Sequence, residues 1–513
     1  MINKDKIVII GAGHNGLIAA CYLARAGREV IVLEASDKPG GGSRTEERLP
    51  GYHFDMHSVA HNIINMTNIP AELELAKAGL EYIEMNPFSV AIRADGQRVR
   101  FYRSIEQTVH SIAAIDPKEA QAYAEFMEFA TPLIRLLMPA IKGETGLLTY
   151  PRRLPDLLKV LRKGSGPLGV VREILSPYES VLKRWLTSDL TRGPISAFAA
   201  HGSSGPHLPG AGIFVFWQAA FHLYGQWHAR GGSVALIDAL GRRLESYGGS
   251  VRCNAPVGAI EASGGQVKAV ILEDGERIET SNVISAIQPQ QALLKLLNPP
   301  LDGKPGRELA AARTSNAVQA LVHVALDRLP PYPNARPEDY YGLQSFVDTL
   351  DEVKQGFLQA EAGYLPDPLP LYAFTTSALD DRLAPPGHHT LYLACPCAPS
   401  RFKKGTWADY QAEFIEKCFA TMENRAPGFK KTIQGVKTFT PDEMEAYTRW
   451  PLAHPMHLDL ALDQLGLMRP TPGLANHRTP VKGLYICGAG TSPVGGIAGT
   501  SGRIVAKLLL KDK

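Results

Sequence analysis

Three glycines near the N-terminus have a spacing that suits phosphate binding. The stretch KIVIIGAGHNG places Gly11, Gly13 and Gly16 directly after the apolar run at 7–10. The first glycine permits a tight turn, the second lets the backbone approach a pyrophosphate, and the third lets a helix pack closely on the strand. Amide groups at the start of the helix that follows would then face the anion.

Glu34, at the end of the second predicted strand, narrows the choice of nucleotide. A carboxylate there accepts hydrogen bonds from a ribose diol and repels a 2′-phosphate, which favours FAD or NAD over NADP. The segment GSGPLG at 164–169 has the same glycine spacing, but it follows a basic helical stretch and not a strand. We therefore interpret this second copy as a linker.

Two further glycine clusters separate FAD from NAD, namely GGGSRT at 40–45 and GAGTSPVGGI at 488–497. Gly40, Gly41 and Thr45 match the GGxxxT pattern of the FAD-dependent superfamily that includes amine oxidases and phytoene desaturases. The chain resembles that superfamily, and the resemblance continues through 230–260, 283–289 and 478–503. It therefore implies one FAD held by both ends and the middle of the chain.

Within the superfamily the chain is similar to the phytoene-desaturase-like branch, on the stretches GAGHNG, GGGSRTEERLPGY, HLDLALDQLGLMRPTPG and GAGTSPVGG. Many relatives have arginine directly after the GG pair, whereas this chain has Gly42 there and Arg44 two residues later. Contact between Arg44 and the flavin therefore stays open. The resemblance places the Val257 backbone at the adenine, Gly490 by the pyrophosphate and ribitol, and Gly496 and Ile497 under the pyrimidine edge of the flavin, at the start of the last helix.

These patterns predict an α/β fold. A discontinuous Rossmann-like FAD-binding domain of the glutathione-reductase or amine-oxidase type would comprise 1–70, 228–300 and 465–513. A second, mixed α+β substrate domain would comprise 71–227 and 301–464, with a helical part near 120–200 for which contact with a membrane stays open. Within these limits, we expect mostly helix over 71–200, a hairpin of strands at 267–272 and 276–284, and a closing helix at 496–510.

Composition excludes several classes of protein. The 513 residues include 54 basic and 51 acidic side chains, a near-balance that gives no general attraction to nucleic acid. The six cysteines are scattered, and none lies in 35–60, where a disulfide reductase of this fold would need a pair. With no signal segment or long apolar run, we expect a cytoplasmic protein.

A basic stretch at 151–192 carries nine basic and four acidic residues. Its segment PRRLPDLLKVLRKG interleaves leucines with arginines and lysines. Such a helix lies on an anionic membrane surface in some proteins and is a solvated face of a packed helix in others, and contact with a partner is a third interpretation. The sequence leaves all three open.

Candidate substrate and proton-transfer residues lie outside the nucleotide patterns. Phe216, Trp217 and Phe221 in AGIFVFWQAAFHLYG predict an apolar substrate pocket, with a buried core helix as the alternative. His57, His61 and His457 are candidates for moving protons, with a structural hydrogen bond as the alternative for each. No third ligand accompanies His454 and His457, so we assign no metal.

The expected function is that of an FAD-dependent oxidoreductase, with hydride transfer between a substrate C–H bond and flavin N5. We expect an apolar, isoprenoid or polyene-like substrate, and O₂, a quinone or another carrier as electron acceptor. Two alternatives stay open. One is an oxidase or dehydrogenase of an amine or small secondary metabolite, and the other is a non-catalytic binding protein on the GTPase-escort version of the fold.

Overall fold

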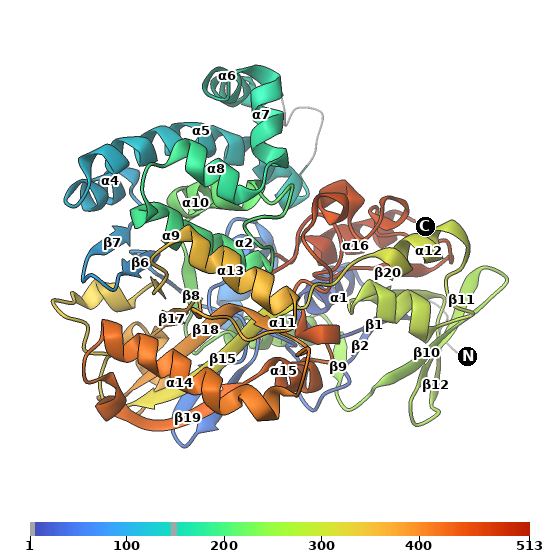
Figure 1. Ribbon diagram of the computed structural model, residues 1–513. Coiled ribbons are helices and arrows are strands. Elements are labelled where there is room, and N and C mark those ends of the chain that lie inside the picture. Colours follow the sequence, from blue (N-terminus) through green and yellow to red (C-terminus); the bar gives the residue numbers. More distant parts are fainter. Residues whose placement is uncertain (1–5, 145–150, 513) are drawn as a thin grey trace.

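A computed structural model describes residues 6–144 and 151–512. Figure 1 shows two large sheets side by side, with a layer of helices above one of them. The α/β fold class expected from the sequence is confirmed, with a parallel Rossmann-like sheet and a separate mixed sheet.

The first sheet is parallel and has five strands in the order β20-β13-β1-β2-β9. Its strands come from the first, middle and last parts of the chain, because β1 pairs with β2 on one side and β13 on the other. The domain limits expected from the sequence stay a prediction. The strands are β1 (Ile7–Ile10), β2 (Val30–Leu33), β9 (Ser250–Arg252), β13 (Asn282–Ser285) and β20 (Leu484–Ile486).

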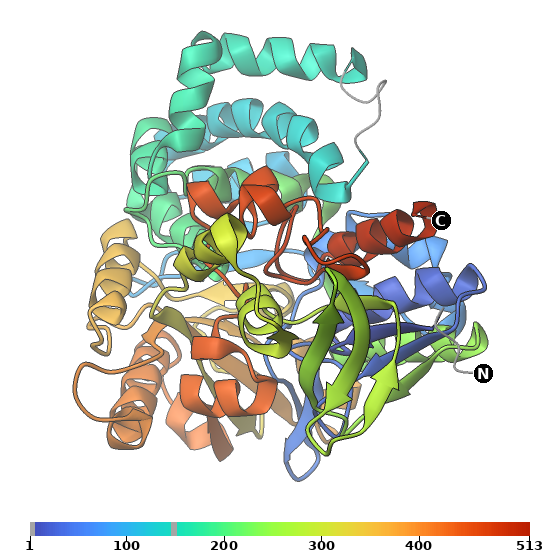
Figure 2. The same ribbon diagram turned by 90° about the vertical axis from the view of Figure 1, so that its right-hand side faces the viewer.

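Successive side chains of β1 are buried on opposite faces of this sheet, as the strand repeat requires. Ile7 and Ile9 join the core under the helices, whereas Val8 and Ile10 join the core shared with a four-stranded sheet. Figure 2 shows that smaller sheet in front of the parallel one. The helices are α1 (His14–Arg25), α11 (Val234–Ser246) and α16 (Thr500–Lys511), and the strands are β10 (Val257–Ser263), β11 (Gln266–Leu272), β12 (Arg277–Glu279) and β14 (Leu297–Asn298).

The mixed sheet has seven strands in the order β19-β15-β18-β17-β16-β6-β7. One face packs on α13 (Leu350–Glu361) and α14 (Trp407–Arg425), and the other face packs with Met56, Val59 and Met85. The strands are β6 (Ser89–Ile92), β7 (Arg98–Phe101), β15 (Ala317–Leu326), β16 (Leu343–Ser345), β17 (Tyr372–Phe374), β18 (His389–Pro399) and β19 (Ile433–Phe439).

A helical layer covers the end of the mixed sheet, and α6 and α7 stand at its outer edge (Figures 1 and 2). The layer comprises α4 (Ile105–Ala113), α5 (Pro117–Lys142), α6 (Leu154–Lys163), α7 (Gly166–Leu175), α8 (Tyr178–Trp185), α9 (Asp189–Ala199) and α10 (Ile213–Tyr224). The remaining short elements are β3 (Thr45–Leu49), β4 (Tyr52–Asp55), β5 (Tyr82–Glu84), β8 (Trp227–Ala229), α2 (Asn62–Asn65), α3 (Ile69–Glu72), α12 (Gly303–Ala311) and α15 (Pro441–Thr448).

Four local expectations differ from the structure. The strand expected at 276–284 is two strands in different sheets, because the Thr280 hydroxyl turns back to the Lys6 carbonyl and interrupts the run. Strands β5 to β7 precede the helices in the region expected to be mostly helical. The closing helix begins at Thr500 and not at 496. The segment GSGPLG follows helix α6, as expected, but its last four residues start helix α7, so only Gly164 and Ser165 form the expected linker.

Helices long and apolar enough to cross a membrane are absent from the described residues.

His323 on β15 makes the stability of the mixed sheet sensitive to acid. Its ring is fully buried and stacks on Phe54, with 4.8 Å between ring centroids. Burial, followed by the nearby Arg48 charge, lowers the pKa of His323 to about 3. Below pH 6.5 His323 therefore binds a proton in the unfolded chain but stays neutral in the folded chain. The free energy of unfolding decreases as the pH falls.

We expect His323→Phe to reduce this loss, because phenylalanine keeps the ring stack and removes the titrating group. Between pH 7.5 and 5.5 the variant should lose about 1 kcal/mol less unfolding free energy than the parent. Urea unfolding at both pH values measures the difference. Equal losses for variant and parent would contradict the assignment.

Candidate active site

A cavity of about 790 Å³ lies between the two large sheets. Its walls come from the glycine loop after β1, the 40–44 loop, the segment 57–63, the start of β10 and the 488–497 loop. The mixed sheet and the helical layer complete the walls. The three glycine clusters predicted to hold one nucleotide thus share one cavity, although the sequence separates them widely.

The loop after β1 has the geometry that its glycines predict. Gly11 has a φ of +97°, a conformation that disfavours a side chain. A Cβ atom at Gly16 would lie 2.1 Å from the Gly11 carbonyl oxygen, so only glycine lets α1 approach β1 so closely. Gly11 and Gly13 line the cavity, whereas Gly16 lies behind them in the packing.

Glu34 lines the cavity at the end of β2. Its carboxylate accepts hydrogen bonds from the backbone amides of Ala12 and Ser36, each at 2.9 Å. These bonds fix the carboxylate beside the glycine loop. Its remaining lone pairs suit the ribose hydroxyls of a dinucleotide. Val257, at the start of β10, lines the same end of the cavity.

The 40–44 loop packs directly on the first glycine loop. The Gly40 amide donates to the Ala12 carbonyl at 3.0 Å, and Gly41 lines the cavity next to Gly13. Arg44 also lines the cavity, with its guanidinium 2.7 Å from Glu46 and over the Tyr447 ring. Its charge is therefore already neutralised within the protein.

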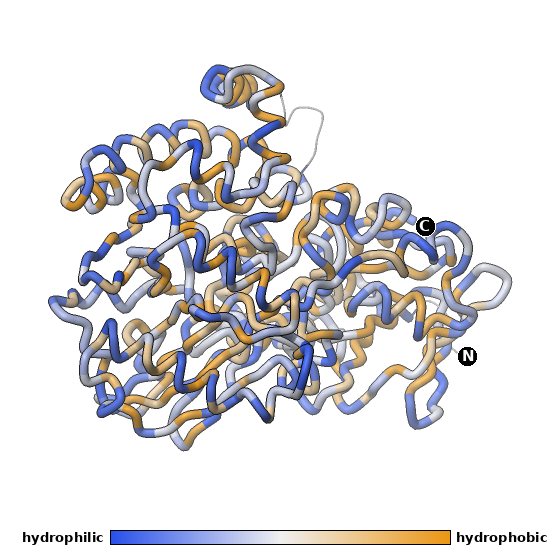
Figure 3. The backbone as a smooth tube through the Cα atoms, in the orientation of Figure 1, coloured by the Kyte–Doolittle hydropathy of each residue, from blue (hydrophilic) through white to orange (hydrophobic). Residues whose placement is uncertain are grey.

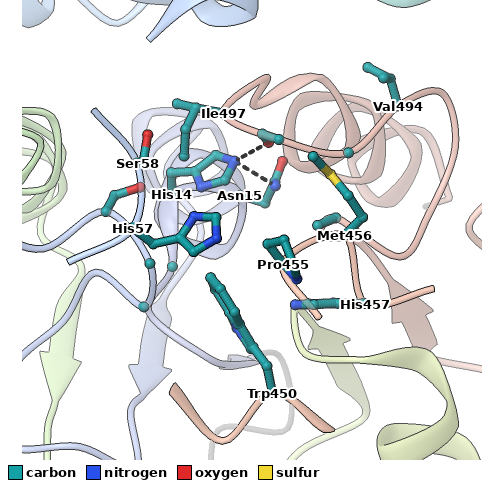
Figure 4. Close-up of a pocket in the computed structure, with 18 of the residues that line it drawn as sticks. His14, Asn15, His57, Ser58, Trp450, Pro455, Met456, His457, Val494 and Ile497 are labelled. Carbon is teal, nitrogen blue, oxygen red and sulfur yellow. Dashed lines mark hydrogen bonds between the residues drawn. The ribbon is translucent and has the colours of Figure 1, made fainter. Parts of the chain in front are cut away.

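The C-terminal glycine loop closes the cavity from the opposite side. Gly496 and Ile497 line it, and His14 Nε2 lies 3.1 Å from the Gly496 carbonyl and 2.8 Å from Asn15 Nδ2 (Figure 4). Since α16 begins at Thr500, these two residues precede the helix instead of forming its N-terminus. Gly490 packs against Pro289 and His457 and does not line the cavity.

Arg469 holds the segment around His457 against this glycine loop. Its guanidinium is completely buried and donates to the carbonyls of Ala489, Asp459, Gln464, Met456 and Leu458. Burial lowers the pKa of Arg469 to about 10, so the side chain remains charged near neutral pH. Sequence reasoning missed this role, although Arg469 lies within the stretch HLDLALDQLGLMRPTPG used for the resemblance.

Trp450 is a second residue that sequence reasoning missed. Its ring lies in the cavity wall beside His57 and His457, at centroid distances of 5.5 and 6.0 Å (Figure 4). A Cβ atom at Gly42 would lie only 2.3 Å from the Trp450 ring. Many relatives have arginine at position 42, and the glycine of this chain was the sequence signal that could have pointed to Trp450. Gly42 leaves room for this ring.

The three candidate histidines occupy different positions. His57 and His457 line the cavity, and among the described residues His57 Nε2 and His457 Nδ1 have no hydrogen-bond partner. Burial lowers the pKa of His57 to about 4 and that of His457 to about 3, so both rings are neutral near pH 7. His61 lies outside the cavity lining and bonds to Tyr82 and Ser233.

The end of the cavity away from the glycine loops is lined mainly by apolar side chains. Trp217 and Phe221 line it as expected, but Phe216 does not. Since neighbouring residues on a helix point in different directions, Phe216 turns into the core against Phe126 and Phe129. Further apolar lining comes from Leu137, Ile141, Ile174, Phe198, Phe214, Leu343, Phe374, Leu460, Leu462 and Leu465.

Comparison with known proteins identifies the family. The family described as "Flavin containing amine oxidoreductase" matches residues 16–510. The chain belongs to this family. A rat protein named "Pyridine nucleotide-disulfide oxidoreductase domain-containing protein 2" is 31% identical, over 98% of this chain and 93% of the rat protein. No cysteine is among the described residues that line the cavity, so the structure offers no thiol pair there.

Two further proteins are similar to this chain over nearly their whole length. "Phytoene desaturase (lycopene-forming)" of Pseudescherichia vulneris is 25% identical, over 99% of both chains. A solved structure of wild-type putrescine oxidase bound to putrescine shares the fold, with a TM-score of 0.62 and 18% identity over 99% of both chains. As a member of the flavin oxidoreductase family, the chain is an enzyme whose cofactor is FAD.

The cavity fits that cofactor. Gly11, Gly13 and Gly41 leave the backbone bare where a pyrophosphate must approach, and the Glu34 carboxylate is held where a ribose diol would bind. Bound FAD supplies a two-electron acceptor for a substrate. The individual contacts of these residues with FAD remain our proposal.

We expect Gly42→Ala to weaken FAD binding on the order of tenfold, because the new methyl group would push the Trp450 ring out of its position. Gly42 does not have a positive φ, so the backbone itself tolerates alanine. Trp450→Ala should remove the clash, and the double variant should bind FAD as the Trp450→Ala variant does. Flavin content after gel filtration and FAD fluorescence titration measure both effects.

Gly241→Ala is the matched control, since a methyl group there meets no atom within 4 Å. A double variant that binds FAD as poorly as Gly42→Ala would show that the clash with Trp450 is not the cause.

Proposed function

We propose that this enzyme desaturates or oxidises a long apolar, polyene-like substrate by hydride transfer to FAD. The apolar lining of the cavity is the observation that carries the proposal. Beyond the nucleotide-binding loops it continues through aliphatic and aromatic side chains from Phe374 on the mixed sheet to Ile141 and Ile174 at the helical layer. Such a lining removes an apolar chain from water and offers it few hydrogen-bond partners.

The distribution of charge supports an uncharged substrate. Of the described residues that line the cavity, only Glu34 and Glu273 are acidic, and both lie at the nucleotide end near Val257. Glu273 is 3.7 Å from Arg449. A cationic substrate at the apolar end would therefore have no carboxylate to balance its charge.

A desaturation removes a proton as well as a hydride from the substrate, and a neutral histidine can accept that proton. Bound FAD would supply the hydride acceptor, and a desaturation would also require a proton to leave the neighbouring carbon of the substrate. His57 Nε2 is buried, neutral and unpartnered among the described residues, so it is our candidate to take that proton. His457 contributes a second neutral ring to the same wall.

The likeness to a phytoene desaturase agrees with an isoprenoid substrate, but the aromatic inner end of the cavity favours a second candidate. Tyr372 and His201 line that end with their ring centroids 4.2 Å apart, and Tyr392 lines the cavity as well. A small amine or secondary metabolite would suit that end. For either substrate we propose reoxidation by O₂, a quinone or another carrier, because the second glycine copy follows helix α6 and forms the start of helix α7, with no strand before it.

Anaerobic bleaching of the bound flavin tests the proposal. A panel of polyenes and amines is added to the FAD-loaded enzyme, and the loss of flavin absorbance is followed. We expect bleaching by polyenes. Bleaching by amines alone would overturn the proposal in favour of the second candidate.

Ala140→Trp adds a test of the route to the flavin. Ala140 lines the cavity from α5 and is exposed, so the larger ring should narrow the outer end without disturbing the core. We expect bleaching by long polyenes to slow on the order of tenfold, with unchanged flavin content. An unchanged bleaching rate would show that the substrate takes another path.

A further inference from the structure

Helices α6 and α7 expose an unusual number of large apolar side chains. Figure 3 shows apolar positions on both helices at the outer edge of the molecule. Leu168 is 85% exposed, and Val160 is the only α6 residue that is buried. The apolar surface comprises Leu154, Leu157, Leu158, Leu168, Val171 and Leu175, which we call the outer apolar surface. Isolated exposed leucines are common, but six large apolar side chains exposed on two consecutive helices are typical of an interaction site.

The spacing shows that each helix presents one apolar face. Leu154, Leu157 and Leu158 follow the helical repeat on α6, and Leu168, Val171 and Leu175 follow it on α7. These faces are not left over from the core, because other residues of the same helices, such as Val170 and Ile174, do the internal packing. Two neighbouring helices therefore point apolar faces toward solvent.

Positive charges accompany this surface. Arg152, Lys159 and Arg162 are exposed, and none has an acidic side chain within ion-pair distance in the part of the chain that the structure describes. Leucines flanked by unpaired cations on one helix are the combination that binds the surface of an anionic bilayer.

One end of α7 lies beside the cavity. Ile174 on α7 lines the cavity one residue before the exposed Leu175. The Gly210 amide donates to the Leu175 carbonyl at 2.8 Å, and Gly210 packs against Leu462. Leu462 lines the cavity and is 45% exposed, and the nearby Leu467 is 83% exposed. Exposed apolar side chains therefore lie both on α7 and beside the lining of the cavity.

We propose that the outer apolar surface docks the enzyme on a bilayer that contains anionic lipids, with the outer end of the cavity against the hydrocarbon. The docking itself rests only on the surface residues. The passage of an apolar substrate from the bilayer into the cavity rests in addition on the proposed function. The unpaired cations favour a lipid surface over a second copy of this chain, because two such surfaces would bring the same positive charges together.

Vesicle flotation of the FAD-loaded enzyme, without substrate, tests the docking. We expect binding to phosphatidylcholine vesicles that contain phosphatidylglycerol, and weaker binding to phosphatidylcholine alone or at high salt. Leu158→Glu with Leu168→Glu should reduce binding to the anionic vesicles at least about tenfold. Lys159→Glu with Arg162→Glu should reduce it about as much, and only when the anionic lipid is present.

Leu358→Glu is the matched control, because Leu358 is an exposed leucine on α13, far from this surface in sequence, and should leave binding unchanged. Equal flotation of the parent and the Leu158→Glu/Leu168→Glu variant would overturn the proposal. It would also be overturned by light scattering that shows a dimer which those two substitutions split.

Flavin bleaching separates failure of docking from failure of the proposed function. The Leu158→Glu/Leu168→Glu variant should bleach normally with detergent-dispersed polyene and slowly with polyene held in vesicles. Bleaching by neither form in the parent would count against the proposed substrate and would leave the flotation result to decide the docking.

Discussion

The close contact between the two ends of the chain is the constraint on which the cofactor site depends. A Cβ atom at Gly502 on α16 would lie 2.2 Å from the Asn15 carbonyl on α1, so these helices touch through backbone. The Ser501 hydroxyl donates to Asn15 Oδ1 at 2.9 Å and accepts from the Gly488 amide at 3.0 Å. Because of this contact, the C-terminal glycine loop stands opposite the loop after β1, and a nucleotide can meet both at once.

Burial gives the cavity its chemistry. The same desolvation that makes His57 and His457 neutral also makes their unpartnered nitrogens costly, so a bound group that reaches them would remove a penalty of about 1–3 kcal/mol each. The charges of two arginines at the site are balanced within the protein. Arg44 is paired with Glu46, and Arg469 is surrounded by backbone carbonyls. The result is a site with a polar nucleotide end and a low-dielectric substrate end.

The helical layer has a buried aromatic core and an exposed apolar face. Its inner residues, such as Phe216 and Phe129, form a dense aromatic core, while α6 and α7 leave leucines exposed. An exposed apolar face costs solubility and gives no folding stability, so a binding role is its natural explanation. In our proposal this face docks the enzyme on a bilayer, and an apolar substrate enters the cavity beside it.

The sequence by itself determined the local parts of the nucleotide site. The run at 7–10, the glycines that follow it and Glu34 are close in sequence, and short-range backbone sterics fix their conformation, so their geometry could be predicted. The resemblance further indicated that 40–45 and 488–497 meet at one FAD. The local patterns also gave the α/β class, but not the break at Thr280 or the start of α16.

Only the tertiary structure decided which distant side chains share the cavity. Phe216 and Trp217 are adjacent and equally aromatic, yet one is core and the other lines the cavity, because the direction of the helix relative to its neighbours selects the face. Trp450 lies far along the chain from Gly42, and nothing in either local sequence requires their contact. Packing between distant parts of the chain determines such contacts, and a sequence pattern of a few residues carries no information about that packing.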